Sequence, residues 1–520
     1  MTKSVNKLVI LLVALLMCAT VVFAACNNST FKAVDKPDKA IAESNGGIAV
    51  KYGEYLYYVN GYTSDVSADN TYSNDVVDAP RIGSVVRIRL SEIEKILAIN
   101  DDKDLTSSEK STKIASAVRG ELKNDEDTPI EGAVTVIPKI YYSGNTTTTQ
   151  FTGIYIFNDR IYVTTPNDEL TANGDPLTNQ LKLMSFDMGG GDPQTHYTFT
   201  SNSAQIWLTC DYTTKKVIAT YLMDNILHKL DVESGTDTVV SLANDPASDV
   251  DNTVSSVNWD QTENKESVFF LDKFGSICKL PIGESNYEVI VENKEWKLHE
   301  HDGESRIENT GATYTIKFVN SGIVYYTVAK GDDTVTDNVV MYWAESAENN
   351  GNVALPVSSL SLYVWKTNKY ITTDSYKSGE KTYYSICIVT VGEENGKATY
   401  TKSAILKYGE NDSSITINKL EGSNLYYTSN SISYVIDLDE AEQAILNNGT
   451  PRAKNIASTT GWAAPDFVNY TTKVDGEDVT YHYIISASTN TVTLTKFNPD
   501  NIKSNNVSIA LTLTAAPEDK

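Results

Sequence analysis

A two-part strand pattern recurs eight times along the chain and restricts its fold more than any other feature. The first part is a run of apolar, β-branched and aromatic residues, and these runs hold many of the 31 tyrosines of the sequence. Such composition favours β-strands, and the Gly, Asn, Asp and Ser residues beside most of the runs favour turns. The eight runs are EYLYYVNG (54–61), DRIYVTT (159–165), KKVIATY (215–221), ESVFFLD (266–272), SGIVYYT (321–327), KTYYSIC (381–387), SNLYYTS (423–429) and VTYHYII (479–485).

A second apolar strand follows each run after a turn-like gap. It usually ends in a large apolar residue and then a residue that favours a turn. Because the two parts keep the same order in all eight copies, we interpret each copy as two strands of one repeating unit. The second parts are VVRIRLS (85–91), LKLMSFD (181–187), ILHKLD (226–231), SICKLP (276–281), VVMYWA (339–344), AILKYG (404–409), ISYVID (432–437) and VTLTKFN (492–498).

The spacing between copies predicts an all-β chain folded as a β-propeller over residues 46–514. The large apolar residues of the second strands are 28 to 96 positions apart, and most steps lie between 44 and 65. Repeats of about 40–50 residues are typical of propeller blades, which are four-stranded sheets that bury their faces against neighbours in a ring. We predict eight blades. Seven is the alternative if the short step from Tyr408 to Ile436 lies within one blade. The large residues are Leu90, Phe186, Leu230, Leu280, Trp343, Tyr408, Ile436 and Phe497.

One passage, about residues 91–125, departs from the strand pattern and predicts a small helical insertion in or after the first blade. Ser91 and Glu94 have the spacing of a capping box, and a second helix is expected to begin at Ser107. Two roles stay open: a lid or arm for a partner, or an insertion packed on the rim of the ring. The final strand, residues 506–514, is expected to pair with the first blade and close the ring.

The repeated order of a tyrosine-rich strand, a turn and a strand ending in Lys, a large residue and Asp or Gly is similar to a known group of bacterial propellers. These propellers are related to the low-density-lipoprotein-receptor propeller and more distantly to TolB. The resemblance extends over roughly residues 45–514 and implies the fold. It implies no catalytic residue, because the group shares no catalytic constellation.

The N-terminus has the layout of a secretory signal. Lys3 and Lys7 precede the uncharged run 8–23, which is short for a spanning helix of about 20 residues. The small residues before Cys26 make residues 1–25 resemble the signal of bacterial lipoproteins. That resemblance implies that the Cys26 sulfur receives a lipid and that cleavage exposes the Cys26 amine. An ordinary secretory signal and an uncleaved anchor are the alternatives.

The segment after Cys26 predicts a flexible tether over residues 26–45. It is polar, contains Pro37 and shows little periodicity. Acyl chains on Cys26 would supply about 0.8 kcal/mol of membrane affinity for each buried CH₂ group. We therefore expect a protein held at the extracytoplasmic face of the cell membrane by a lipid, with a short C-terminal tail at residues 515–520.

The net charge of the chain disfavours two classes of binding partner. The formal net charge is −25 at pH 7. Nucleic acid is disfavoured as a partner, because contacts with its phosphates dominate the affinity of proteins that bind it. A peripheral electrostatic contact with anionic lipid is also disfavoured, because the negatively charged protein repels it. The lipid anchor must therefore hold the protein at the membrane.

Three cysteines remain beyond the N-terminal region, at Cys210, Cys278 and Cys387, each in an apolar strand-like run. We interpret them as buried free thiols. One disulfide with a third cysteine left over is the alternative. The sequence has no CxxC motif and therefore predicts neither a zinc ribbon nor a thioredoxin-like site.

We expect no cofactor, although two weak metal candidates stay open. His299 and His301 would share one face of a strand, where two imidazoles can bind one metal ion. Asp245, Asp249 and Asp251 form an acidic stretch that offers the oxygen ligands of a structural calcium ion. For both candidates the simpler interpretation is a solvated polar turn.

Two functions are compatible with what the sequence shows of catalytic residues and surface aromatic residues. No catalytic residue is identified, and the string nearest to a GxSxG elbow, Gly283–Tyr287, lacks its second glycine. Trp296 and Trp462 lie in loop-like contexts and are candidate surface aromatics. We expect a binding or scaffold module for an envelope protein, a peptide or a glycan. The alternative is a propeller enzyme that acts on an extracellular glycan or another polymer.

Overall fold

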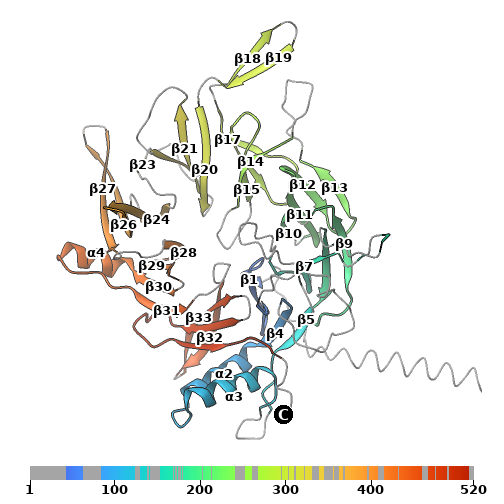
Figure 1. The fold of residues 1–520 in the computed structure, drawn as a ribbon, viewed down its shortest axis with the longest axis vertical. Coiled ribbons are helices and arrows are strands. Elements are labelled where there is room, and N and C mark those ends of the chain that lie inside the picture. The colour runs from blue at the N-terminus through green and yellow to red at the C-terminus, as the bar shows by residue number, and fades with distance from the viewer. Residues whose placement is uncertain are drawn as a thin grey trace, which may run out of the picture.

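The computed structural model shows a ring of antiparallel sheets (Figure 1). Each sheet uses strands that are consecutive in the chain, so every sheet is a meander. The structure describes residues 42–61, 83–122, 129–137, 140, 153–167, 169, 172–173, 177, 180–201, 203–211, 213–240, 252–259, 267–293, 296–301, 304–309, 312–320, 323–330, 339–344, 355–356, 362–366, 369–394, 397–407, 415–430, 432–458, 466–474, 476–488 and 491–514.

The first four sheets cover the N-terminal half of the ring. The N-terminal sheet has five strands and the next three sheets have four strands each. Their strands are β1 (Ala42–Glu43), β2 (Ala49–Tyr52), β3 (Tyr55–Val59), β4 (Val85–Arg89) and β5 (Val134–Ile137); β6 (Tyr155–Phe157), β7 (Arg160–Pro166), β8 (Leu181–Asp187) and β9 (Gln194–Phe199); β10 (Gln205–Asp211), β11 (Lys216–Met223), β12 (Ile226–Asp231) and β13 (Thr236–Val239); β14 (Ser255–Trp259), β15 (Ser267–Leu271), β16 (Ile277–Pro281) and β17 (Glu288–Val291).

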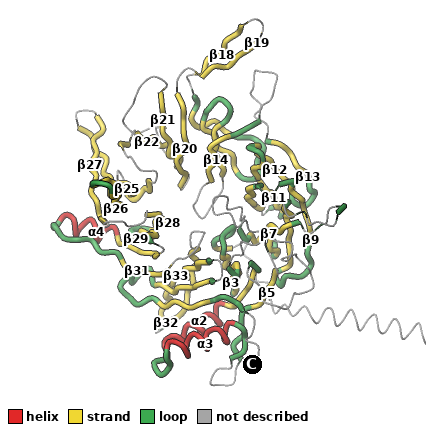
Figure 2. The backbone as a smooth tube through the Cα atoms, in the orientation of Figure 1, coloured by secondary structure: helices red, strands yellow, loops and turns green. Residues whose placement is uncertain are grey.

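The C-terminal half begins with a two-stranded hairpin, β18 and β19, that projects from the ring in Figures 1 and 2. Four more four-stranded sheets follow it. The strands are β18 (Trp296–His301) and β19 (Glu304–Asn309); β20 (Ala312–Asn320), β21 (Ile323–Lys330), β22 (Val339–Ala344) and β23 (Leu355–Pro356); β24 (Leu362–Lys366), β25 (Lys369–Ser378), β26 (Lys381–Glu394) and β27 (Lys397–Lys407); β28 (Ile415–Glu421), β29 (Asn424–Ser429), β30 (Ile432–Asp437) and β31 (Lys454–Ser458); β32 (Asp466–Val474), β33 (Glu477–Ala487), β34 (Val492–Phe497) and β35 (Val507–Ala510).

The predicted all-β propeller is confirmed. Among the described residues, seven sheets have four strands, which is the blade number of the seven-blade alternative, although the step from Tyr408 to Ile436 joins two sheets and is not the reason for it. The five-stranded N-terminal sheet contains the first of the eight sequence copies, and with it eight sheets follow one another around the ring. Each of the eight copies therefore corresponds to a sheet of its own.

The two parts of most copies are the two middle strands of a sheet, for example β7 with β8 and β11 with β12. The copy at 381–409 differs, because its parts lie on β26 and β27, the third and fourth strands of their sheet. The next copy returns to the middle strands β29 and β30. This shift by one strand explains the short step from Tyr408 to Ile436, which spans two sheets rather than one hairpin.

Tyrosines of the first parts form much of the core. Tyr57, Tyr58, Tyr221, Tyr326 and Tyr427 are all fully buried. Aromatic side chains bury large areas between sheets, and this suits a ring in which each sheet packs its two faces on its neighbours. Separate apolar clusters accordingly join the β6–β9 sheet to the β10–β13 sheet, and the β24–β27 sheet to the β28–β31 sheet.

The predicted closure of the ring by its final strand is wrong. β35 pairs with β34 inside the last sheet and does not extend the first. The segment after β35 instead contacts the first sheet through side chains. The Tyr58 hydroxyl donates to the Leu511 carbonyl at 2.7 Å, and the Asn60 side chain exchanges two hydrogen bonds with the Leu513 backbone, each 2.8 Å. Side chains can bridge two complete sheets without breaking either ladder.

The helical insertion comprises α2 (Leu90–Asp101) and α3 (Ser107–Val118). Both pack against β35, so they cover the outer side of the junction between the first and last sheets. The Glu94 carboxylate accepts a hydrogen bond from the buried Tyr483 hydroxyl and pairs with Lys496 at 2.6 Å. The insertion is thus packed on the rim.

Two helix predictions need correction. α2 begins at Leu90 and has no side-chain cap, so Ser91 lies inside the helix and caps nothing. The capping box belongs to α3, where Thr106 and Glu109 exchange the paired hydrogen bonds. A third helix, α4 (Leu438–Leu446), was not expected, although Asp437 caps it and Asp439 and Glu440 fill its first turn.

The N-terminal boundary also moves. Residues 1–41, with the predicted signal and most of the tether, lie outside the described residues, as does the tail 515–520. The last part of the predicted tether is folded, because Ala42–Glu43 forms β1 on the inner edge of the first sheet. Among the described residues, no helix is both long and apolar enough to cross a bilayer.

Candidate functional site

The candidate residues found from the sequence do not converge on one site. Cys26 and Trp462 lie outside the described residues, and so does the acidic stretch with Asp245, Asp249 and Asp251. Their roles stay predictions. Within the described residues, no group of three or more His, Cys, Asp or Glu side chains is placed to hold a metal ion.

The projecting hairpin carries the histidine pair. His299 and His301 lie on β18, two positions apart and opposite Arg306 and Glu304 of β19. Trp296 was expected in a loop but begins the same strand, because residues 296–301 pair with residues 304–309. The two histidines thus occupy alternate positions of one strand, and the metal site stays a prediction.

The three cysteines of the ring are buried and free, as predicted. Burial raises the pKa of the Cys210 and Cys278 thiols. A raised pKa lowers the thiolate fraction, and the thiolate is the reactive form of cysteine. These side chains are therefore core residues and not nucleophiles.

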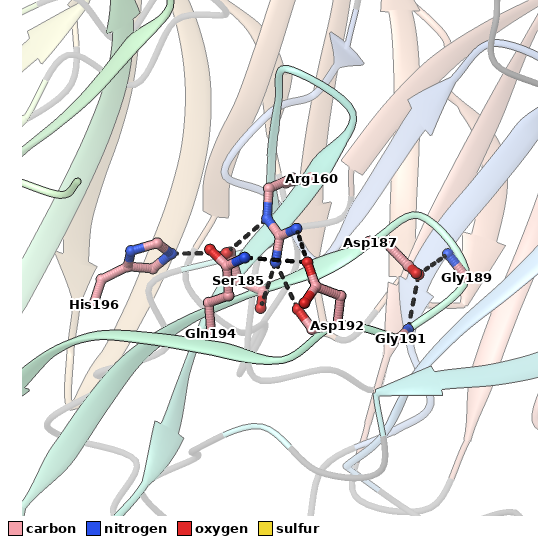
Figure 3. Close-up of polar contacts among 8 residues, drawn as sticks. All are labelled: Arg160, Ser185, Asp187, Gly189, Gly191, Asp192, Gln194 and His196. Atoms are coloured by element: carbon pink, nitrogen blue, oxygen red, sulfur yellow. Dashed lines mark hydrogen bonds and ion pairs between the residues drawn. The ribbon is translucent and has the colours of Figure 1, made fainter. Parts of the chain in front are cut away.

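A polar cluster lies on the β6–β9 sheet (Figure 3). Arg160, at the start of β7, donates from Nε to Ser185 Oγ at 2.9 Å and from another nitrogen to the Asp192 carboxylate at 2.8 Å. Ser185 Oγ lies 2.7 Å from His196 Nε2. Gln194 donates to Asp192 at 3.1 Å. Adjacent strands and one turn thus bring together a serine, a histidine, an arginine and an acid.

This cluster has the residue types of a nucleophilic site but not its geometry. Ser185 is fully buried, and the Arg160 guanidinium already occupies one lone pair of its oxygen. The Ser185 hydroxyl hydrogen is left to donate to His196 Nε2. Burial, with Arg160 nearby, lowers the pKa of His196 and favours the neutral ring that this hydrogen bond needs. These contacts hold the β8–β9 turn in place.

Asp187 organises the same turn and shows what the strand-ending Asp does. Its carboxylate accepts hydrogen bonds from the backbone of Gly189 at 2.8 Å and Gly191 at 2.7 Å. The end of the third strand carries an equivalent side chain in other sheets, and each accepts two backbone N–H groups. These are Asp231, Asp437 and Asn498. The turn residue predicted from the repeat is therefore a local backbone cap.

A second polar cluster crosses the junction of the first and last sheets. The Asn469 N–H donates to Glu43 at 2.7 Å, and its carbonyl accepts from Lys51, which also pairs with Glu43. The Asn469 side chain lies 2.8 Å from His482 Nδ1, and His482 Nε2 lies 2.7 Å from Glu421. The sequence alone did not predict this series of polar contacts, because its residues lie on three different sheets.

The two clusters use their charged groups internally. The hydrogen bond from His482, helped by Lys419, lowers the pKa of Glu421 to about 2, so this carboxylate is an ion-pair partner and not a general acid. Each described buried histidine, serine or acid of these clusters has its partner within the ring. The hydrogen bonds among the described residues therefore hold the strands and turns of the ring in place, which favours binding through the surface of the ring.

Alternate turns of each meander lie at opposite ends of its strands, which gives the ring two faces. In the four-stranded sheets, the entry face carries the turns from first to second strands, such as Asn158–Asp159 and Gly422–Ser423, and in the five-stranded sheet it carries the β2–β3 turn. The far face carries the turns from second to third strands, such as Asp224–Asn225 and Ser488–Thr491. Hydrogen bonds link neighbouring turns on the entry face, as from Tyr52 to Asp159 at 2.5 Å.

Comparison with known proteins does not assign this chain to a family. No family model matches the chain, and no curated protein does. Three similar solved structures are an oligogalacturonate lyase from Vibrio parahaemolyticus (12% identity, 69% of this chain and 95% of that chain, TM-score 0.27), BamB from Moraxella catarrhalis (13%, 66% and 81%, 0.28) and TolB from Acinetobacter baumannii (11%, 64% and 62%, 0.23). Their similarity to this chain is too low to indicate an activity or a partner.

Proposed function

We propose that this protein is a membrane-anchored extracytoplasmic lipoprotein whose propeller is a binding or scaffold module for an envelope protein, a peptide or a glycan. The observation that carries the proposal is the position of β1. The chain joins the ring at Ala42, and only residues 27–41 separate Ala42 from Cys26, the residue proposed to carry the lipid. A lipid on Cys26 would therefore hold the whole ring close to the membrane.

The hydrogen bonds among four polar side chains support a binding role. Ser185, His196, His482 and Glu421 hold strands and turns together. A ring stiffened in this way offers a constant surface, and preorganised surfaces bind with less loss of conformational entropy.

The anchor is tested by Cys26→Ala. Without the thiol no lipid can be attached, so the variant should leave the membrane fraction or accumulate as the uncleaved precursor. Mass spectrometry of the N-terminal peptide and fractionation of the cells measure both results. Cys18→Ala is the matched control, because it removes the other cysteine of the signal region and should change neither. Wild-type mass and fractionation of Cys26→Ala would contradict the proposal.

The scaffold role is tested by purifying the tagged full-length chain from detergent-solubilised membranes of the source cells, with and without EDTA. A stoichiometric envelope protein or a retained intact glycan supports the binding role. A glycan that shortens during incubation indicates the enzyme instead. A result that changes with EDTA points to the acidic stretch at Asp245, Asp249 and Asp251.

A further inference from the structure

The chain enters the ring from one defined face. On β1 and β2, Ala42 lies opposite Tyr52, beside the β2–β3 turn of the entry face. The chain then runs toward the far face and turns at Gly46 and Gly47 into β2. Since β1 is the innermost strand of its sheet, the entry point lies near the ring centre (Figure 1).

Residues 42–47, which we call the strap, are fixed on the side of the last sheet. The Ser44 hydroxyl donates to the Phe467 carbonyl of β32 at 3.1 Å. Glu43 accepts from the Asn469 N–H of the same strand at 2.7 Å. These contacts pair strap side chains with the free inner edge of β32, so the strap cannot swing away from that sheet without losing them.

The strap is also fixed on the side of the second sheet. Asn45 accepts from the Ile156 N–H at 2.7 Å, and Gly46 donates to the Ile154 carbonyl at 2.7 Å. A Cβ on Gly153 would lie only 1.9 Å from the Gly46 carbonyl oxygen, which shows how closely the two segments approach. The chain therefore leaves the ring at a fixed place on the entry face.

The reach of the chain between Cys26 and Ala42 is limited. At about 3.3–3.6 Å per residue, residues 27–41 extend at most about 50–55 Å in any conformation. A path around the first sheet to the far face crosses four strands spaced about 4.8 Å apart and then passes along a blade about 20 Å deep. That path uses most of the maximal length. Electrostatic attraction to the membrane does not offset the cost of extending the chain, because the protein, with its net charge of −25, is repelled by an anionic bilayer.

We propose that the entry face of the ring lies toward the membrane and that the far face points away and is the surface open to partners. This orientation rests on the lipid anchor of the proposed function. The partner of the entry face is the bilayer surface itself, and partners of the far face approach from the extracytoplasmic solution.

The orientation is measured by energy transfer from a dye on the lipidated full-length protein to an acceptor-labelled lipid in phosphatidylcholine vesicles. Glu477→Cys labels the entry-face end of β33, and Thr491→Cys labels the far-face turn beyond its other end; both positions are exposed. Cys210, Cys278 and Cys387 are buried and do not compete for the dye. Because β33 is about 35 Å long, transfer from position 477 should be about twofold or more above transfer from position 491.

A control variant carries a Gly/Ser insertion of about 30 residues between Lys39 and Ala40, which should reduce the difference between the two dyes. Equal transfer from both positions, or stronger transfer from position 491, on vesicle-bound protein would overturn the orientation while leaving the anchor intact. Protein that stays unbound would overturn the anchor, and the orientation with it.

Discussion

At the scale of single residues, buried polar side chains define how the sheets are held together. His482 is buried on β33 and lies between Asn469 of the same sheet and Glu421 of the preceding sheet. His196 similarly connects Ser185 with the backbone of Val232 in the next sheet. Such residues cost free energy when they lose a partner, because a buried polar group without a hydrogen bond cannot return to water.

Glu421 gives a prediction about acid stability. Its pKa in the folded protein is lowered to about 2, first through the hydrogen bond with His482, whereas the unfolded value is about 4.3. The stabilisation is therefore complete above about pH 4–5 and is lost as the pH falls toward about 2. Between these values, the free energy of unfolding should fall less for Glu421→Gln than for the wild type, as measured by denaturant titration at each pH.

The control for this experiment is Glu477→Gln, which removes an exposed carboxylate at the start of β33. It should keep the acid dependence of the wild type. If Glu421→Gln and the wild type lose stability in parallel between about pH 5 and pH 2, the ion pair does not contribute as the geometry indicates.

At the scale of elements, the helices join sheets to one another. α4 follows β30, and three of its acids pair with neighbouring sheets: Asp439 with Lys366, Glu442 with Lys369 at 2.5 Å, and Glu440 with Lys503 at 2.9 Å. α2 and α3 do the same at the junction of the first and last sheets. The helices therefore act as outer braces.

The corrected position of the capping box predicts how two substitutions will differ. Thr106→Ala removes the side-chain oxygen that accepts from the Glu109 N–H, and such a loss typically costs about 1 kcal/mol. Ser91→Ala should change the stability little, because Ser91 is exposed inside α2 and does not cap it. Amide hydrogen exchange across residues 107–118 measures the effect. Equal loss of protection in both variants would contradict the assignment.

At the scale of the whole molecule, the described residues close the ring through side chains and helices and not through a shared sheet. The strap contacts β32 and β6 on the inside, and α2 contacts β35 on the outside. Both ends of the folded chain therefore meet at one junction. We expect this junction to control how the ring opens, since in the described part of the chain no ladder of backbone hydrogen bonds joins the first and last sheets.

Two glycines test the inner closure. Gly153 and Gly379 both have positive φ, 84° and 67°, so alanine at either position pays the same backbone strain, about 1–2 kcal/mol. Only Gly153→Ala also crowds the strap, because a Cβ on Gly379 would meet nothing within 4 Å. Gly153→Ala should therefore cost at least about 2 kcal/mol more than Gly379→Ala and should speed amide exchange at Gly46. Similar losses in the two variants would show that the strap does not hold the ring.

The sequence by itself determined the strands, their grouping and the propeller. Strand alternation, turn residues and repeat spacing are local properties, so they can be recognised without knowing what each strand packs against. The strand-ending Asp187 and Asp231 were predicted as turn residues for the same reason, since they cap their own turns. α4 could also have been found, because Asp437 and the acids after it form an ordinary helix start.

Only the tertiary structure decided how the ring closes and where its polar side chains meet. Ser44 and Phe467 are 423 positions apart, and His482 and Glu421 are 61 apart. A ring brings its first and last units together, and no local pattern records which side chains will face each other there. The free energy of such contacts depends on burial and on distance in space, and both are set only when all the sheets are in place.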